Sequence, residues 1–295
     1  MTYYHIKSPQ PDGGGASAGV EMAKTALITG GAGAIATALS RKLLAKGFDL
    51  VLVDVDQARL DQAAASAPGR VVACCADLTD RADLERVADL VADTPDLALF
   101  VNNAGVIRPG DFASLPYGDV ELQIAVNLLA PMRLTHAAAA RFVAERGGCI
   151  LSIISTGGLV ALPGSAAYSA SKFGLRGLMI ALAQETAPFG VKVRSLFPGA
   201  VDTPMLRYEA THGGSVLNFL NKDVLTAEAV AAAAVRALDG DRIELSLPAG
   251  EALSGRIVCA FPALMPKLLP HFVKQGEQGL KRFLTSRGLS PTHAR

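Results

Sequence analysis

The chain has 295 residues; 50% are hydrophobic, 19% are charged, and the formal net charge is +1. This composition supports a sizeable buried core and excludes an intrinsically disordered chain. With no long Lys/Arg block, we expect no nucleic-acid partner. The four cysteines, Cys74, Cys75, Cys149 and Cys259, lack metal-ligand spacing. We therefore expect free thiols, no metal site and a cytoplasmic protein.

The first 22 residues differ from the rest. They contain "SPQPDGGGASAG", which is rich in Pro, Gly and Ser and has no periodicity. We expect a disordered leader, because the basic-then-apolar order of a signal peptide is missing, and Met22 is an alternative start. No uncharged apolar stretch reaches the length of about 18 residues that a spanning helix needs.

From Lys24 the chain alternates between apolar runs and amphipathic segments. Strands are predicted at 25–30, 48–56, 70–78, 97–105, 149–155 and 191–199. Helices are predicted at 34–47, 57–69, 80–95, 119–146 and 166–190. This alternation predicts a doubly wound α/β domain over residues 23–250, with a mostly parallel sheet covered by helices on both faces. Residues 251–295 form a C-terminal extension.

The first strand ends in the glycine-rich turn "TGGAGAIA", Thr29 to Ala36. Backbone N–H groups of such a turn and of the following helix receive a pyrophosphate. The alternative is a tight strand–helix turn with no ligand. The second strand ends at Asp54, whose carboxylate suits the hydroxyls of an adenine ribose and repels a 2′-phosphate, which favours NAD over NADP. Its neighbours Val53 and Val55 carry no positive charge, and the alternative is a solvated acid.

The next two strands also end in small polar groups. The third ends at Asp77, and the fourth ends in "NNAG", Asn102 to Gly105. Because parallel strands present their carboxyl ends at one edge of the sheet, we expect these groups on the same rim as the glycine-rich turn.

The segment "STGGLVALPGSAAYSASKFG" carries the acid–base chemistry. Tyr168 and Lys172 are four residues apart, hence on one helix face, and Ser155 ends the preceding strand. A lysine ammonium favours a tyrosinate, so we expect Lys172 to lower the Tyr168 pKa from about 10. An ordinary helix surface is the alternative, but it leaves the coincidence with Asp54 and the glycine-rich turn unexplained.

Together these motifs, with "VNLLAP" around Asn127 and "PGAVDTPM" after the sixth strand, resemble the short-chain dehydrogenase/reductase family over roughly residues 24–250. The resemblance implies a single-domain Rossmann fold of about seven strands, in a homodimer or homotetramer. It implies that Tyr168 exchanges a proton with the substrate oxygen and that Ser155 holds this oxygen. Lys172 would bind the nicotinamide ribose, and Asn127 would kink its helix and hold a water.

The cofactor-binding residues that follow from the motifs and the resemblance form one set: Gly30, Gly33, Ala34, Ile35, Asp54, Asp77, Leu78, Asn103, Ala104, Gly105, Tyr168, Lys172, Pro198, Gly199, Val201 and Thr203. The family usually has glycine where this chain has Ala34 and Ala36. We expect the Ala34 methyl group to crowd the pyrophosphate, so that NAD binding is retained but weakened.

These features predict an NAD-dependent oxidoreductase that interconverts a secondary alcohol and a ketone. Apolar residues Leu217, Phe219 and Leu220 of a predicted lid, residues 206–226, suggest an apolar substrate that is steroid-, retinoid- or lipid-like. The alternative for the lid is a loop folded onto its own protein. The alternative function is a catalytically silent nucleotide-sensing or partner-binding protein on the same scaffold.

The extension is apolar and basic; from residue 261 to 288 its charged residues are Lys267, Lys274, Lys281, Arg282 and Arg287 against Glu277. Three alternatives remain: a helix that caps the pocket or contacts another subunit, a peripheral segment on a membrane surface, and disorder. Because Pro262, Pro266 and Pro270 interrupt the segment, we expect any helix to begin near Pro270.

Overall fold

The computed structural model describes residues 24–67, 69–221, 223–261, 263 and 265–290; the predicted leader lies outside them. Within this part, seven parallel strands form one sheet in the order β3-β2-β1-β4-β5-β6-β7. The strands are β1 (Lys24–Thr29), β2 (Phe48–Asp54), β3 (Val71–Cys75), β4 (Leu97–Asn102), β5 (Cys149–Ile153), β6 (Lys192–Pro198) and β7 (Glu244–Leu247).

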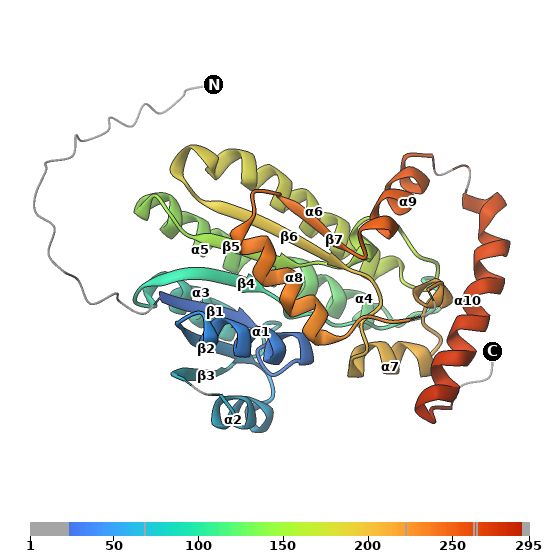
Figure 1. Cartoon of the computed structure of the whole chain (residues 1–295), viewed down its shortest axis with the longest axis horizontal. Helices are drawn as coiled ribbons and strands as arrows, with labels where there is room; N and C mark the ends of the chain where they lie inside the picture. Colours follow the sequence, from blue (N-terminus) through green and yellow to red (C-terminus); the bar gives the residue numbers. More distant parts are fainter. Residues whose placement is uncertain (1–23, 68, 222, 262, 264, 291–295) are drawn as a thin grey trace, which may run out of the picture.

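Helices cover both faces of the sheet (Figure 1). One face carries α1 (Ala34–Ala45), α2 (Gln57–Ala65) and α8 (Ala227–Asp239), which share one buried apolar core with the strands. A second core lies under α3 (Arg81–Asp93), α5 (Ala130–Glu145) and α6 (Ala166–Thr186), and α4 (Tyr117–Ile124) packs beside α6. The predicted doubly wound α/β architecture, with apolar strands covered on both sides, is confirmed.

Side-chain caps account for several helix starts. Asp56 accepts a hydrogen bond from the Arg59 N–H at 3.0 Å and begins α2, and Asp80 does the same for α3 with the Asp83 N–H at 2.9 Å. Each oxygen satisfies one of the first-turn N–H groups that have no partner inside the helix. Because Asp56 caps α2, the Asp54 carboxylate is not needed as the cap of this helix.

The helical region predicted at 119–146 is interrupted. Between α4 and α5, residues Ala125–Leu129 form a π-helical turn that contains the fully buried Asn127. Such single wide turns break the regular hydrogen-bond ladder and re-aim the side chains within them. The turn directs the Asn127 amide at the end of β4, as its hydrogen bonds described below require.

The C-terminal half adds α7 (Pro204–Thr211), the short 3₁₀ segment η4 (Val216–Phe219), α9 (Ala249–Ala260) and α10 (Met265–Arg287). The expected start of the last helix near Pro270 is wrong, because α10 begins at Met265 and Pro270 lies inside it. Pro266 falls in the first turn, where N–H groups need no partner, and Pro270 forfeits only one hydrogen bond. Two further short turns are η2 (Thr156–Gly158) and η3 (Ala187–Phe189).

Helix α10 packs closely against η4 and near α7 (Figure 1). At Gly276 and Gly279 a Cβ atom would overlap the carbonyl oxygens of Val216 and Phe219. Phe283 and Leu284 of α10 are buried in a third apolar cluster, where the Phe283 ring centre lies 5.0 Å from that of Phe219. The buried face of this helix is therefore covered by the protein, which disfavours the disordered alternative for residues 265–287.

In the described part of the chain, no helix has the length and apolarity that crossing a membrane requires. The peripheral membrane contact expected as an alternative gains no support, since Phe283 and Leu284 pack inward.

Gly279→Ala tests how α10 is held. The added methyl group meets the Phe219 carbonyl oxygen, so we expect the free energy of unfolding to fall by about 1–3 kcal/mol, as for other overpacked sites. The control is Gly177→Ala in α6, where a Cβ has open space and where helix propensity predicts a gain of up to about 1 kcal/mol. Urea unfolding measures both, and equal stabilities of the two variants would contradict this packing.

Candidate active site

The turn after β1 is hydrogen-bonded to the segment that follows β4. The Thr29 hydroxyl accepts hydrogen bonds from the N–H groups of Asn103 at 3.1 Å and Ala104 at 3.2 Å. The Asn103 amide donates to the carbonyl oxygens of Thr29 and Gly30, both at 3.1 Å. Gly30 has φ +63°, and a Cβ there would lie 2.8 Å from the Ala104 Cα, so the position requires glycine.

Helix α1 begins at Ala34 directly after this turn. Gly33 is its N-cap and supplies no side-chain hydrogen bond, so the first N–H groups of α1 remain available for an anion. Ala34 and Ile35 are partly buried and pack against the core beneath the helix. The expected weakening of NAD binding by Ala34 stays a prediction.

Asp54 faces the same turn. Its carboxylate accepts hydrogen bonds from the N–H groups of Ala32 at 3.0 Å and Asp56 at 3.2 Å. Arg59, an exposed residue in the first turn of α2, donates from Nη2 to the Ala32 carbonyl oxygen at 2.9 Å. A positive charge therefore lies near Asp54 although its sequence neighbours are valines. Arg59 could have been predicted from the sequence, because it follows the helix cap Asp56 by three residues and so lies in the first turn of α2.

The residues after β3 offer fewer free polar atoms at the carboxyl edge of the sheet. Asp77 is exposed, and one of its oxygens accepts from the N–H and the hydroxyl of Thr79 at 2.8 and 2.7 Å. Leu78 packs against the core under α3 and α5. One Asp77 oxygen is thus engaged within its own turn.

A cavity of about 120 Å³ opens at the carboxyl end of the sheet. Ten of the predicted site residues line it: Ile35, Asn103, Gly105, Ser155, Tyr168, Lys172, Pro198, Gly199, Val201 and Thr203. The other predicted residues, among them Gly30, Gly33 and Asp54, lie outside its lining. The structure therefore brings the proposed acid–base residues and part of the proposed cofactor residues to one hollow.

Ser155 and Tyr168 face each other across this cavity. Ser155 has φ +132°, a conformation that costs on the order of 1–3 kcal/mol for a residue other than glycine. Its hydroxyl oxygen accepts from the Gly157 N–H at 3.0 Å and lies near the Tyr168 hydroxyl group, whose pKa it lowers. A Cβ at Gly157 would lie 3.0 Å from the Tyr168 ring, so glycine leaves the ring its place.

The predicted lowering of the Tyr168 pKa is wrong for this structure. Burial raises this pKa well above its usual range and outweighs the opposite effect of Ser155, and the charge of Glu209 raises it further. Lys172 is 3% exposed, and burial lowers its own pKa to about 8, which weakens its charge near neutral pH. Its Nζ lies 5.5 Å from the centre of the Tyr168 ring.

Asn127 ties the π-helical turn to this group. Its Oδ1 accepts from the Val106 N–H at 2.8 Å, and its Nδ2 donates to the Val106 carbonyl oxygen at 2.9 Å. A Cβ at Gly105 would lie 3.4 Å from Asn127 Oδ1 and 3.5 Å from Lys172 Nζ. The glycine of "NNAG" thus leaves a small space between the amide and the ammonium.

Comparison with known proteins places this site in a family. The model of the short chain dehydrogenases matches residues 24–213, more than half of the chain. Oxidoreductase UcpA of Salmonella typhimurium is 34% identical over 187 residues, which are 62% of this chain and 71% of that protein. The chain belongs to the short-chain dehydrogenase/reductase family. It is therefore an oxidoreductase of the NAD(P)-dependent kind.

Three other similar proteins are also dehydrogenases. The D-beta-hydroxybutyrate dehydrogenase of Rhizobium meliloti is 35% identical over 191 residues, 63% of this chain and 74% of that protein. A short-chain dehydrogenase from Sphingobium yanoikuyae in complex with NADPH has a TM-score of 0.72 and 30% identity, covering 82% of this chain and 95% of that one. A bulky-bulky ketone specific alcohol dehydrogenase from Comamonas testosteroni has a TM-score of 0.68 and 25% identity, covering 82% and 94%.

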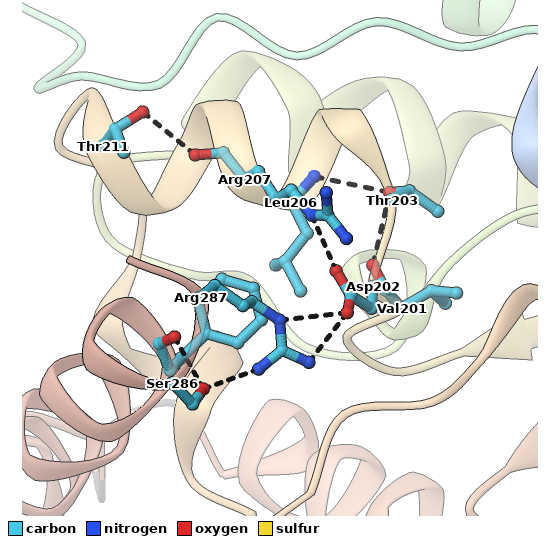
Figure 2. Close-up of polar contacts among 9 residues, drawn as sticks. Val201, Asp202, Thr203, Leu206, Arg207, Thr211, Ser286 and Arg287 are labelled. Atoms are coloured by element: carbon cyan, nitrogen blue, oxygen red, sulfur yellow. Dashed lines mark hydrogen bonds and ion pairs between the residues drawn. The ribbon is translucent and has the colours of Figure 1, made fainter. Parts of the chain in front are cut away.

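In this short-chain dehydrogenase the loop after β6 is linked to α10. Asp202 accepts from Arg207 Nε of α7 at 3.0 Å and from Arg287 of α10 at 2.9 and 2.7 Å, as Figure 2 shows. Partial burial alone would raise the Asp202 pKa, but the hydrogen bonds from Arg287 and Arg207 outweigh it and hold the pKa below its usual range. Thr203 caps α7 through the Leu206 N–H.

The predicted lid folds onto its own protein. Leu217 and Phe219 are buried, and neither they nor Leu220 line the cavity, so their apolar character does not report on the substrate. The segment thus packs on its own protein, while its residues Leu206, Glu209 and Asn218 still line the cavity. Apolar lining comes from Leu206 and from residues outside the segment, among them Ile107, Leu162 and Met205.

Five polar residues of the cavity lining were not found by sequence reasoning. They are Thr156 in η2, Ser165 before α6, Ser169 in α6, Glu209 in α7 and Asn218 in η4. Glu209 is 7% exposed, and burial raises its pKa to about 7 although the hydrogen bond from Asn218 lowers it. The motifs assign them no role, because the inward direction of an isolated Glu or Ser is set by tertiary packing.

Glu209→Gln tests this burial through the pH dependence of stability. Below pH 4.5 the carboxyl group is neutral in both states and costs nothing. As pH rises from 4.5 towards 7 the unfolded chain ionises first, so the parent loses about 3 kcal/mol relative to the variant, and the loss stays constant above pH 7. We therefore expect the gain in Tm of Glu209→Gln to be larger at pH 8 than at pH 4.5.

The control is Glu121→Gln, which changes an exposed glutamate of α4 and should leave the pH profile unaltered. Parallel Tm profiles of Glu209→Gln and the parent between pH 4.5 and 8 would contradict the raised pKa.

Proposed function

We propose that the chain interconverts a ketone and a secondary alcohol, with NAD preferred to NADP, and that Tyr168 transfers the proton. The observation that carries the proposal is the placement of the Ser155 and Tyr168 hydroxyl groups in one cavity with the buried Lys172. A silent binding protein needs no such pair, whereas carbonyl reduction needs two hydroxyl groups at the oxygen where negative charge develops.

The residues present fit a dinucleotide. The uncapped start of α1 suits the pyrophosphate, and the Asp54 carboxylate, held against the glycine-rich turn, suits the adenine ribose. Val201 and Thr203 line the cavity on the side of the β6 loop, where the nicotinamide would be held. When bound, the reduced cofactor supplies the hydride that the carbonyl carbon receives.

Residues of the chain would supply the remaining chemistry. Ser155 would hold and polarise the carbonyl oxygen, and the Tyr168 hydroxyl would donate its proton to that oxygen as the C–O bond becomes single. The raised pKa of Tyr168 keeps the phenol protonated at neutral pH, which suits proton donation. Lys172, with a pKa of about 8, would hold the nicotinamide ribose and help to restore the proton.

The apolar part of the lining supports a small, largely apolar substrate. Ile107, Leu162 and Leu206 surround the space next to the hydroxyl pair. Burying hydrocarbon against them contributes roughly 25 cal/mol per Å².

Tyr168→Phe tests the proton transfer. With NADH and a panel of cyclic ketones, we expect kcat to fall by about 10²- to 10⁴-fold while the Kd of NADH, measured by fluorescence, changes by less than about threefold. Tyr117→Phe is the control, because Tyr117 is 71% exposed at the start of α4. A Tyr168→Phe enzyme as active as the parent would refute this mechanism.

Asp54→Ser tests the cofactor preference. We expect the parent to bind NADH more tightly than NADPH, and the variant to narrow that ratio by about tenfold, because the carboxylate that repels a 2′-phosphate is gone and Arg59 remains close by. Asp56→Ser is the control, since serine also caps a helix. Fluorescence titration gives the four constants, and tighter NADPH binding by the parent would contradict the NAD preference.

A further inference from the structure

The cavity holds a second polar group that the proposed reaction does not use. Glu209 projects from α7 and is 7% exposed, and its Oε1 accepts from Asn218 Nδ2 at 3.0 Å. Among the described residues, Asn218 is the one donor to this carboxyl group, and Oε2 accepts no hydrogen bond. A buried carboxyl group with a single neutral partner is costly in the free protein.

Ser165 belongs to the same cavity lining, but its hydroxyl group is closed off from the cavity. It is 4% exposed, and its Oγ has no hydrogen-bond partner in the described part of the chain. Its loop lies against the end of α7, since a Cβ at Gly164 would be 3.8 Å from the Gly213 carbonyl oxygen. Because the Ser165 Oγ exposes almost no surface, a ligand in the cavity contacts the Glu209 carboxyl group and not this hydroxyl.

The charges around the cavity restrict what this ligand group is. A carboxylate would meet the like charge of Glu209. An ammonium would share the cavity with Lys172, which is the one other residue of formal charge among the described lining residues. A hydroxyl group carries no charge and donates to a carboxyl oxygen, so it adds the second hydrogen bond that Glu209 can accept.

We infer that Glu209, held in place by Asn218, binds a hydroxyl group of the substrate that is remote from the carbonyl carbon being reduced. The inference rests on the proposed function and narrows its substrate class from apolar ketones to hydroxyketones and the diols that they form. The apolar lining would then contact the carbon skeleton between the two oxygens.

Matched probes test the inference. The parent is assayed with NADH on 4-hydroxycyclohexanone and 4-methylcyclohexanone, and on the 3-substituted pair, which places the hydroxyl at a different reach. The two members of each pair differ mainly in the hydroxyl group. We expect kcat/KM for the better hydroxyketone to exceed that of its methyl partner by about tenfold or more, because the latter leaves the Glu209 carboxyl group without a second hydrogen bond.

Variants assign this preference to the residues. In Glu209→Leu we expect the ratio of the two kcat/KM values to fall to about one, and in Ser165→Ala, whose hydroxyl the cavity does not reach, to stay as in the parent. Glu209→Gln keeps an oxygen that accepts from Asn218 and should retain part of the preference. This variant therefore separates loss of the hydroxyl contact from a folding defect. Glu121→Leu, on the exposed face of α4, should leave both the ratio and the activity unchanged.

The two possible failures are distinguishable. Turnover of every ketone at equal kcat/KM within each pair would overturn the hydroxyl site and leave the proposed function standing. A Glu209→Leu enzyme that loses activity but keeps the ratio would also overturn it, since that result indicates a structural role. No turnover of any ketone or hydroxyketone with NADH or NADPH would overturn the proposed function and this inference with it.

Discussion

The close approach of the β1 turn to the end of β4 is the constraint on which the site depends. The strand order reverses between these two neighbours, so the crossovers leave in opposite directions and open a crevice at the carboxyl edge. Gly30 has no room for a side chain there, and Thr29 and Asn103 tie the two segments by hydrogen bonds. Gly105 and Val106 follow directly, and through Val106 the Asn127 amide comes to lie near Lys172.

Much of the architecture could be predicted because its signals are local. Apolar runs without polar alternation indicate strands covered on both faces, and Asp56 and Asp80 mark helix starts by the side-chain caps that they form. The spacing of Tyr168 and Lys172 placed both on one helix face, and both line the cavity. Each of these inferences needed only the residues within one or two elements.

The rest depends on contacts between distant segments. The glycine-like backbone of Ser155 follows from its surroundings, and the raised Tyr168 pKa follows from a burial that no spacing rule contains. Arg59 and Glu209 reach the site from helices whose rotation is decided by packing. Pro270 misled the prediction for α10, because one lost hydrogen bond is outweighed by the buried contacts of Phe283 and Leu284.

The wall formed by α7, η4 and α10 has an apolar cluster of its own, separate from the cores on the two faces of the sheet. Its link to the loop after β6, from Asp202 to Arg287, spans 85 residues of chain. Segments held in this way open as cooperative units, at free energies below that of global unfolding. Amide hydrogens of this wall would therefore exchange with solvent together and ahead of those in the sheet, so the cavity can admit and release ligands while the Rossmann scaffold stays closed to water.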